Sequence, residues 1–179
     1  MKGMNMEKKI VVFIDSGDTI IDESTEVRND RDVVVTAKVI PGADRLLRIL
    51  KEQGYRVALV ADGYKESFDN IYRHLGLTDF FEQMIVSSVV GTEKPSSRMF
   101  ETALEKMNLT KKDCAHIIMV GNNIERDIRG ANSMGIISVL QDWTPRYRMT
   151  PESEEEIPDY IIHNPLELLE LLRQLERDS

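Results

Sequence analysis

The sequence predicts an α/β fold built on a single, doubly wound parallel sheet. Short apolar segments rich in β-branched residues alternate with longer amphipathic segments along most of the chain. This alternation is typical of parallel strands joined by crossover helices. A chain of 179 residues is long enough for one domain with a full core, and no linker-like stretch divides it. We therefore expect a single domain over residues 1–179, with its core at about 9–140.

The first predicted strand covers residues 8–14 and leads directly to Asp15. After it, residues 20–40 combine a turn-like TEVRND segment with the β-branched DVVVTAKVI segment, which predicts a small β-hairpin flap instead of a cap domain. A helix with an apolar stripe follows, and it should end at Gly54, a residue type suited to a helix C-terminus.

The alternation then continues along the chain. The helix over residues 95–107 is predicted to carry Pro95 in its first turn, a position that proline favours. A polar, acidic loop precedes an edge strand and an amphipathic terminal helix, together about 159–177. The remaining predicted strands cover 56–61, 84–88, 116–121 and 136–140, and the remaining helices cover 64–76 and 124–135.

The composition narrows the class of protein and its partners. A formal net charge of −8 argues against a general nucleic-acid surface. The longest apolar runs are too short to span a bilayer, so we expect no membrane insertion. The single cysteine, Cys114, excludes an internal disulfide framework and fits a reducing compartment, so we expect a cytoplasmic location.

Polar residues follow four of the predicted strands where each strand ends. Because the carboxyl ends of parallel strands lie at one edge of a sheet, these groups should converge in one cleft. Taken singly, Asp15 could cap a turn and Lys94 could be a solvated loop residue, but their joint placement favours a site. A lysine among carboxyl and carboxamide groups suits a phosphate bound with a hard cation such as Mg²⁺. The converging residues are Asp15, Asp62, Gly63, Lys94, Asn122 and Asn123, with Asp127 one turn into the next helix.

Four segments, in this order, resemble the motifs of the haloacid dehalogenase (HAD) superfamily, whose members are mostly Mg²⁺-dependent phosphatases. IVVFIDSGDTII resembles the first motif, and VIPGADRLLRILKEQGYRVALVADG resembles the helix and strand that lead to the second. GTEKPSSRMFETALEKM resembles the third motif, and IIMVGNNIERDIRGANSMGI resembles the fourth. The resemblance runs from about Lys9 to Leu140.

The resemblance implies roles for individual residues. Asp15 would attack phosphorus and carry the phosphoryl group as an acyl phosphate, and Lys94 would neutralise the nucleophile and the phosphoryl group. The substrate would be a phosphorylated small molecule or macromolecule, and an open cleft is compatible with a homo-oligomer. Mg²⁺ would be held by Asp15, the backbone carbonyl of Gly17 and Asn122, with support from Asp127. The implied substrate-binding positions are Ala61, Asp62, Gly63 and Asn123.

Three positions depart from the family pattern. Gly17 stands where the family has the carboxylate that protonates the leaving group and later activates water, and Asp18 is one residue too late to be an obvious substitute. Ala61 replaces a Ser or Thr that would contact the phosphoryl oxygens, and Asn122 replaces a metal-binding aspartate. Two functions therefore stay open: a phosphatase-type hydrolase, and a catalytically impaired domain that binds a ligand or a protein partner.

Dehalogenases and phosphonatases of this superfamily also tolerate changes at the position of Gly17, but both use residues from a helical cap. The interval between Asp15 and Ala61 is filled by the predicted flap and one helix, which disfavours both branches.

Two further features have alternative interpretations. Asn123 could be a helix N-cap, or it could hydrogen-bond Lys94 or a substrate. The aromatic and basic residues 143–148 could line the cleft or contact a partner, or they could form a loop anchored by Trp143.

Overall fold

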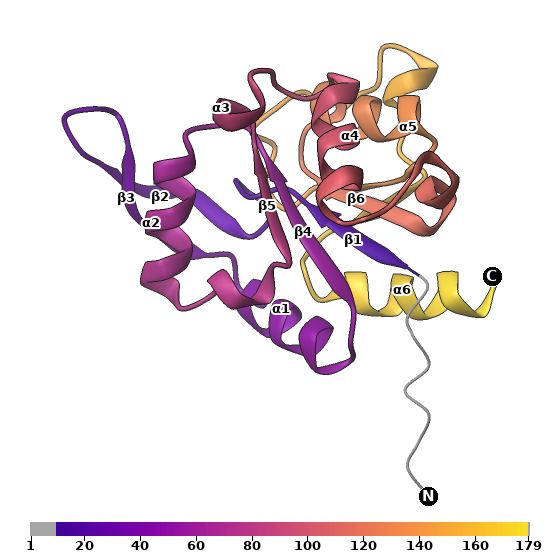
Figure 1. Cartoon of the computed structure of the whole chain (residues 1–179), viewed down its shortest axis with the longest axis horizontal. Coiled ribbons are helices and arrows are strands. Elements are labelled where there is room, and N and C mark those ends of the chain that lie inside the picture. Colours follow the sequence, from indigo (N-terminus) through magenta and orange to yellow (C-terminus); the bar gives the residue numbers. More distant parts are fainter. Residues whose placement is uncertain (1–9, 179) are drawn as a thin grey trace, which may run out of the picture.

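The computed structural model describes residues 10–178, and its centre is a sheet of six parallel strands (Figure 1). The strand order is β5-β4-β1-β6-β7-β8, so the chain winds outward from β1 in both directions, as predicted. Residues 8 and 9 of the first predicted strand lie outside the described residues. The strands are β1 (Val11–Ile14), β4 (Arg56–Ala61), β5 (Gln83–Val86), β6 (Ile117–Gly121), β7 (Ile137–Gln141) and β8 (Tyr160–Ile162).

Alternate residues of the central strand pack against helices on opposite faces of the sheet, as the two-residue period of a strand requires. Val12 and Ile14 join the core formed with α1, α2 and α6, whereas Val11 and Phe13 join the core formed with α4 and α5. Within residues 10–178, no helix is long and apolar enough to cross a bilayer. Apart from one four-residue helix described below, the α-helices of residues 10–178 are α1 (Ala43–Glu52), α2 (Lys65–Leu75), α4 (Ser97–Lys106), α5 (Arg129–Met134) and α6 (Glu167–Arg177).

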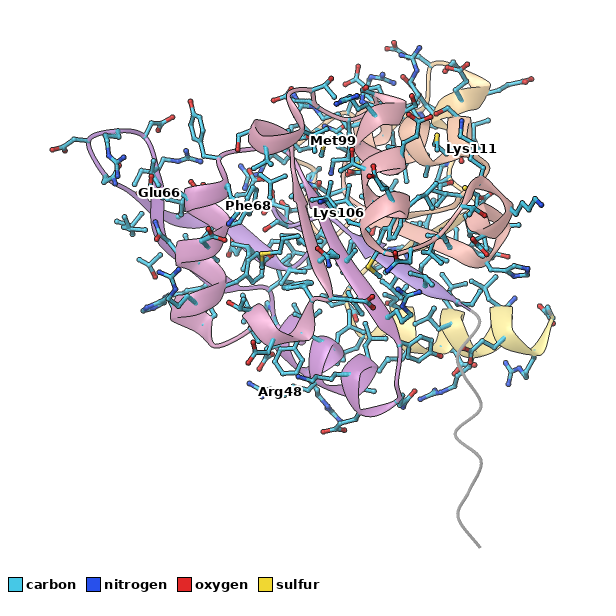
Figure 2. All side chains as sticks on the ribbon, viewed as in Figure 1. Arg48, Glu66, Phe68, Met99, Lys106 and Lys111 are labelled. Atoms are coloured by element: carbon cyan, nitrogen blue, oxygen red, sulfur yellow. The ribbon has the colours of Figure 1, made fainter. Side chains whose placement is uncertain are left out.

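The predicted flap is present as an antiparallel hairpin of β2 (Ile21–Arg28) and β3 (Val34–Val39), which lies beside α2 (Figure 1). The Val34 N–H donates to Ser67 Oγ at 3.0 Å, and the Asn70 side-chain amide donates to the Val34 carbonyl at 3.1 Å. Nearer the tip, Arg31 pairs with Glu66, labelled on α2 in Figure 2, at 2.7 Å. The second strand of the hairpin is therefore anchored to α2.

Two element boundaries were predicted wrongly. The strand predicted over 84–88 ends at Val86, and Ser87–Val90 form the short helix α3, in which Ser87 Oγ accepts a hydrogen bond from the Gly63 N–H at 2.8 Å. Pro95 is not in the first turn of α4, which begins at Ser97. Lys94 and Pro95 lie instead in a turn closed by the hydrogen bond from the Ser96 N–H to the Glu93 carbonyl at 3.0 Å, and the helix starts only after this turn.

The segment predicted as one helix over 124–135 begins instead as a π-helical turn, Ile124–Ile128, and continues as α5. The turn is widened because the Asn123 carbonyl accepts hydrogen bonds from both the Asp127 and the Ile128 N–H groups, at 2.8 and 3.4 Å. Such turns occur frequently at functional sites.

Helices α4 and α5 approach closely at Gly130. A Cβ atom on Gly130 would lie 2.4 Å from Cε2 of Phe100 and 3.3 Å from Cα of Pro95. Because Lys94 directly precedes Pro95 and Asp127 lies in the turn before Gly130, this approach brings Lys94 and Asp127 together.

We expect Gly130→Ala to destabilise the protein by about 1–3 kcal/mol, because the added methyl group overpacks the contact with Phe100. Elsewhere in a helix, glycine to alanine is stabilising, so a loss of stability has a steric origin. Urea denaturation measures the change. The double variant Gly130→Ala/Phe100→Leu should lose less than the sum of its parts, and strict additivity would contradict the steric explanation.

Candidate active site

A cavity of about 300 Å³ lies where β1, β4 and β6 end, beside the hairpin. Ala61 is not among its lining residues: it is buried in the core on the α1 and α2 face of the sheet. The other eight residues predicted for the site all line the cavity: Asp15, Gly17, Asp62, Gly63, Lys94, Asn122, Asn123 and Asp127.

Lys94 is buried in the wall of this cavity, with 3% of its surface exposed. Its ammonium group donates to Asp15 Oδ1 at 2.9 Å, to Asp127 Oδ1 at 2.7 Å and to the Val60 carbonyl at 2.7 Å. An ammonium group has three N–H donors, so all of them are used. Lys94 therefore orients Asp15, and it has no further N–H donor for a bound anion, on which it could act only through its charge.

Asp15 follows β1 directly, and its backbone N–H donates to the Val120 carbonyl of β6 at 2.9 Å. Lys94 holds Oδ1 of the carboxylate, whereas Oδ2 accepts no hydrogen bond from residues 10–178. One oxygen of Asp15 is thus fixed, and the other is available to a ligand in the cavity.

Asp127 supports Lys94 from within the protein. Its Oδ1 accepts from Lys94, and its Oδ2 accepts from the Asn123 N–H at 3.1 Å. A Cβ atom on Gly121 would lie 2.1 Å from Asp127 Oδ2, so glycine at the end of β6 leaves room for this carboxylate. The Asn123 side chain caps the turn by accepting from two backbone N–H groups, at 3.0 and 3.2 Å, which favours the N-cap interpretation.

Asp62 holds Lys94 from the β4 side. Its Oδ1 accepts the Lys94 backbone N–H at 3.0 Å, and its Oδ2 lies 4.0 Å from Lys94 Nζ and 3.4 Å from Arg126 Nη1. The carboxylate is thus directed toward cations, which fits a role in positioning Lys94 better than direct contact with a phosphate.

The oxygen groups around Asp15 fit a hard cation such as Mg²⁺. The Gly17 carbonyl accepts only a long hydrogen bond, 3.4 Å from Thr19 Oγ1. Asn122 is 1% exposed, and its Nδ2 is buried without a partner within residues 10–178. Buried polar groups are normally paired, so this N–H donor indicates a place where a water or an acceptor oxygen of a ligand binds, whereas the side-chain oxygen of Asn122 is the atom suited to a cation. One carboxylate with neutral oxygens is a common Mg²⁺ environment when substrate oxygens and water complete it.

The donor set is nevertheless poor in charge. Within residues 10–178, no group of three or more His, Cys, Asp or Glu side chains could hold a metal ion. A cation at this site would therefore depend on neutral oxygens of the protein and on its substrate.

Sequence reasoning missed Glu23 of β2, which lines the cavity. Its backbone N–H donates to Asp18 Oδ1 at 3.1 Å, and its Oε2 lies 3.2 Å from Nε of Arg146, which also pairs with Asp18. The position of Glu23 depends on how the hairpin folds back over Asp15. The only sequence signal was indirect: Gly17 has no side chain and so leaves room for Glu23.

Both interpretations of residues 143–148 hold in part. Tyr147 lines the cavity, and Trp143 packs against the core on the α1 and α6 face. The segment is therefore a loop anchored by Trp143 that also contributes a wall of the cavity.

Burial and charge shift the pKa values of several groups in the cavity. Burial, followed by the negative charge of Asp18, raises the pKa of the Glu23 carboxyl from 4.5 to about 7. Burial also raises the pKa values of Asp62 and Asp127. For Lys94, burial lowers the pKa, but the surrounding carboxylates outweigh it and keep the ammonium group charged.

We expect the stability of Glu23→Gln relative to wild type to increase as the pH rises from about 4.5 to about 7. The folded protein holds the Glu23 proton to higher pH than the unfolded chain, so wild-type stability is lost as this group ionises across that window. Melting temperatures of both proteins between pH 4 and pH 8, measured with a chelator present, test this expectation. A pH-independent difference would contradict it, and Glu52→Gln on the exposed side of α1 serves as the control.

Comparisons with known proteins agree with the HAD resemblance. The family model of haloacid dehalogenase-like hydrolases matches residues 2–135. The chain is 30% identical over 142 residues to glyceraldehyde 3-phosphate phosphatase of Methanopyrus kandleri, covering 79% of this chain and 59% of that protein. It is 31% identical over 119 residues to phosphoserine phosphatase of Thermus thermophilus, covering 66% of this chain and 45% of that protein. The chain thus spans only about half the length of these relatives.

Solved structures agree on the fold. The HAD-hydrolase YfnB of Bacillus subtilis, bound to magnesium, superposes with a TM-score of 0.73 at 19% identity, covering 91% of this chain and 98% of that chain. The HAD phosphatase of Thermococcus onnurineus superposes with a TM-score of 0.65 at 25% identity, covering 76% of this chain and 59% of that chain. On the family match and these relatives, this chain belongs to the haloacid dehalogenase-like hydrolases.

Proposed function

We propose that this chain hydrolyses phosphomonoesters of small molecules through a phosphorylated form of Asp15. The Asp15–Lys94 pair carries the proposal. A buried ammonium fixes one carboxylate oxygen at 2.9 Å, and the other oxygen is available at the cavity. The relatives named as phosphatases of glyceraldehyde 3-phosphate and phosphoserine support the reaction class.

In this reaction the free oxygen of Asp15 attacks phosphorus while the bond from phosphorus to the leaving oxygen breaks. Lys94 holds Asp15 in place and offsets negative charge on the phosphoryl group. Asp62 and Asp127 hold Lys94 in turn, so its charge is already in position before the substrate binds. Catalysis by such preorganised charge costs little rearrangement during the reaction.

The negative charge around Lys94 supports a role for a divalent cation. Three carboxylates, Asp15, Asp62 and Asp127, lie within 4.0 Å of its ammonium group, and Arg126 also pairs with Asp62, so these five groups have a formal charge of −1 and offer no net attraction to a phosphate. Mg²⁺ would be held by Asp15, the Gly17 carbonyl and Asn122, with Asp127 behind Lys94. When bound, the ion would neutralise phosphoryl oxygens.

The size and rim of the cavity favour a small substrate. A volume of about 300 Å³ is at the lower end of the range for small-molecule sites. Arg28, Arg126, Tyr64 and Tyr147 also line it, so the part of the substrate beyond the phosphate would meet guanidinium and aromatic groups.

Wild-type protein with Mg²⁺ is expected to hydrolyse small phosphomonoesters and to form an acyl phosphate that hydroxylamine cleaves. Asp15→Asn should lower kcat by about 10³-fold or more and abolish the acyl phosphate. Phosphate release and acid-quench labelling measure both. Asp22→Asn, which removes a carboxylate of β2 outside the cavity, is the control. An unreactive wild type that still binds phosphate analogues would favour a catalytically impaired binding module.

Mg²⁺ together with beryllofluoride, a phosphoryl mimic, is expected to raise the melting temperature of wild type and to have no effect on Asp15→Asn. Asn122→Asp should reach half of the shift at a lower Mg²⁺ concentration, because it adds a charged oxygen ligand. EDTA should reverse the shift in both proteins. If neither Mg²⁺ nor beryllofluoride shifts wild type, the metal-dependent mechanism is wrong.

A further inference from the structure

The hairpin places a carboxylate beside Gly17, the position in the loop after β1 that has no side chain. A Cβ atom on Gly17 would lie 1.9 Å from Glu23 Oε1, 2.7 Å from its Cδ and 2.9 Å from its Cγ. The end of the Glu23 side chain thus fills the space that a side chain of residue 17 would occupy. Residue 17 is two positions after Asp15, and both Glu23 and Asp15 line the cavity.

The structure holds Glu23 in this place through several contacts. Its backbone N–H donates to Asp18 Oδ1 at 3.1 Å, and Gly17 forms a β-bridge with Ile21 at the start of the same strand. Arg146 binds Oε2 at 3.2 Å, whereas Oε1, the atom next to Gly17, accepts no hydrogen bond from residues 10–178. One carboxylate oxygen is therefore anchored, and the other is free to meet a substrate.

The other acidic residues near Asp15 are already engaged. Asp18 is fully buried, its oxygens are taken by Glu23 N–H and Arg146, and it does not line the cavity. Asp62 and Asp127 each bind Lys94 and one further donor. Glu23 is thus the carboxylate best placed to exchange a proton with a group bound at Asp15.

We propose that Glu23, supplied by the hairpin, is the catalytic acid and base of this site, a role that rests on the proposed phosphatase function. In the first step an Asp15 oxygen bonds to phosphorus. The bond from phosphorus to the ester oxygen breaks, and that oxygen takes the proton of the Glu23 carboxylic acid and leaves as an alcohol. In the second step the Glu23 carboxylate takes a proton from water. The oxygen of that water bonds to phosphorus while the bond from phosphorus to the Asp15 oxygen breaks, which releases hydrogen phosphate and restores Asp15 as a carboxylate and Glu23 as an acid.

The leaving group provides a test that a purely structural role would not pass. An alkoxide leaving group needs a proton, whereas 2,4-dinitrophenolate leaves without one. We expect Glu23→Gln to lower kcat/KM for an alkyl phosphate such as glycerol phosphate by about 10²–10⁴-fold. With 2,4-dinitrophenyl phosphate, the variant should still form the acyl phosphate at nearly the wild-type rate and then accumulate it, because water is no longer activated. The control Asp22→Asn, on the same strand outside the cavity, should neither lower kcat/KM for glycerol phosphate nor accumulate the acyl phosphate.

Transferring the carboxylate from position 23 to position 17 provides an independent test. Glu23→Ala removes all three atoms that a Cβ atom on residue 17 would meet, so it makes room for a side chain there. We expect Glu23→Ala/Gly17→Asp to regain at least about tenfold of the alkyl phosphatase activity that Glu23→Ala loses. Gly17→Asp alone should impair activity, because its side chain collides with Glu23. Melting temperatures establish that each variant is folded.

The possible failures are distinguishable. If wild type depends on Asp15 but Glu23→Gln hydrolyses alkyl phosphate within threefold of wild type, the role of Glu23 is wrong and the phosphatase proposal stands. Equal losses on the alkyl and dinitrophenyl substrates, with no accumulated acyl phosphate and no gain on moving the carboxylate, would make Glu23 a structural partner of Arg146 and overturn the proposal. A wild type with no turnover would overturn both proposals.

Discussion

The site depends on the buried ammonium group of Lys94. Lys94 donates its three N–H groups to Asp15, Asp127 and the Val60 carbonyl. Its position is therefore fixed by residues at the ends of β1, β4 and β6. A buried charge is tolerated only when its partners are also held in place. The features around it meet this condition: Gly121 admits Asp127, Gly130 lets α4 approach α5, and Asp62 binds the Lys94 backbone.

This arrangement also determines what the site lacks. Carboxylates outnumber the ammonium group, and none of the three N–H donors is left for a phosphate. The Asn122 side chain, whose Nδ2 has no partner within residues 10–178, and the weakly engaged Gly17 carbonyl line the same cavity. Positive charge for a phosphate would therefore come from the guanidinium groups of Arg28 and Arg126 at the cavity, or from a cation held by Asp15 and neutral oxygens.

Much of the site could be predicted because the rule that locates it is topological. Parallel strands end at one edge, so Asp15, Asp62, Lys94 and Asn122 were expected to meet, and they line one cavity. Ala61, the last residue of β4, lies in the core and does not line the cavity, whereas Asp62 and Gly63 after it do.

The missing part depends on tertiary structure. Glu23 reaches the cavity through the fold of the hairpin, and Arg146 reaches Glu23 from a loop after β7. Neither the periodicity of hydrophobic residues nor the sequence distance from Asp15 predicts where these two side chains lie. The start of α4 was missed for a local reason: Lys94 and Pro95 lie in a turn closed by the Ser96 N–H on the Glu93 carbonyl, so the helix begins two residues after Pro95.

The overlap of Gly17 and Glu23 in space also constrains how this sequence can change over time. A side chain at position 17 and a long one at position 23 exclude each other, so neither position can evolve independently. A lineage that exchanges one arrangement for the other passes through an intermediate with either two colliding carboxylates or none. Across related chains, the two positions should therefore covary, with a small residue at one accompanying an acid at the other.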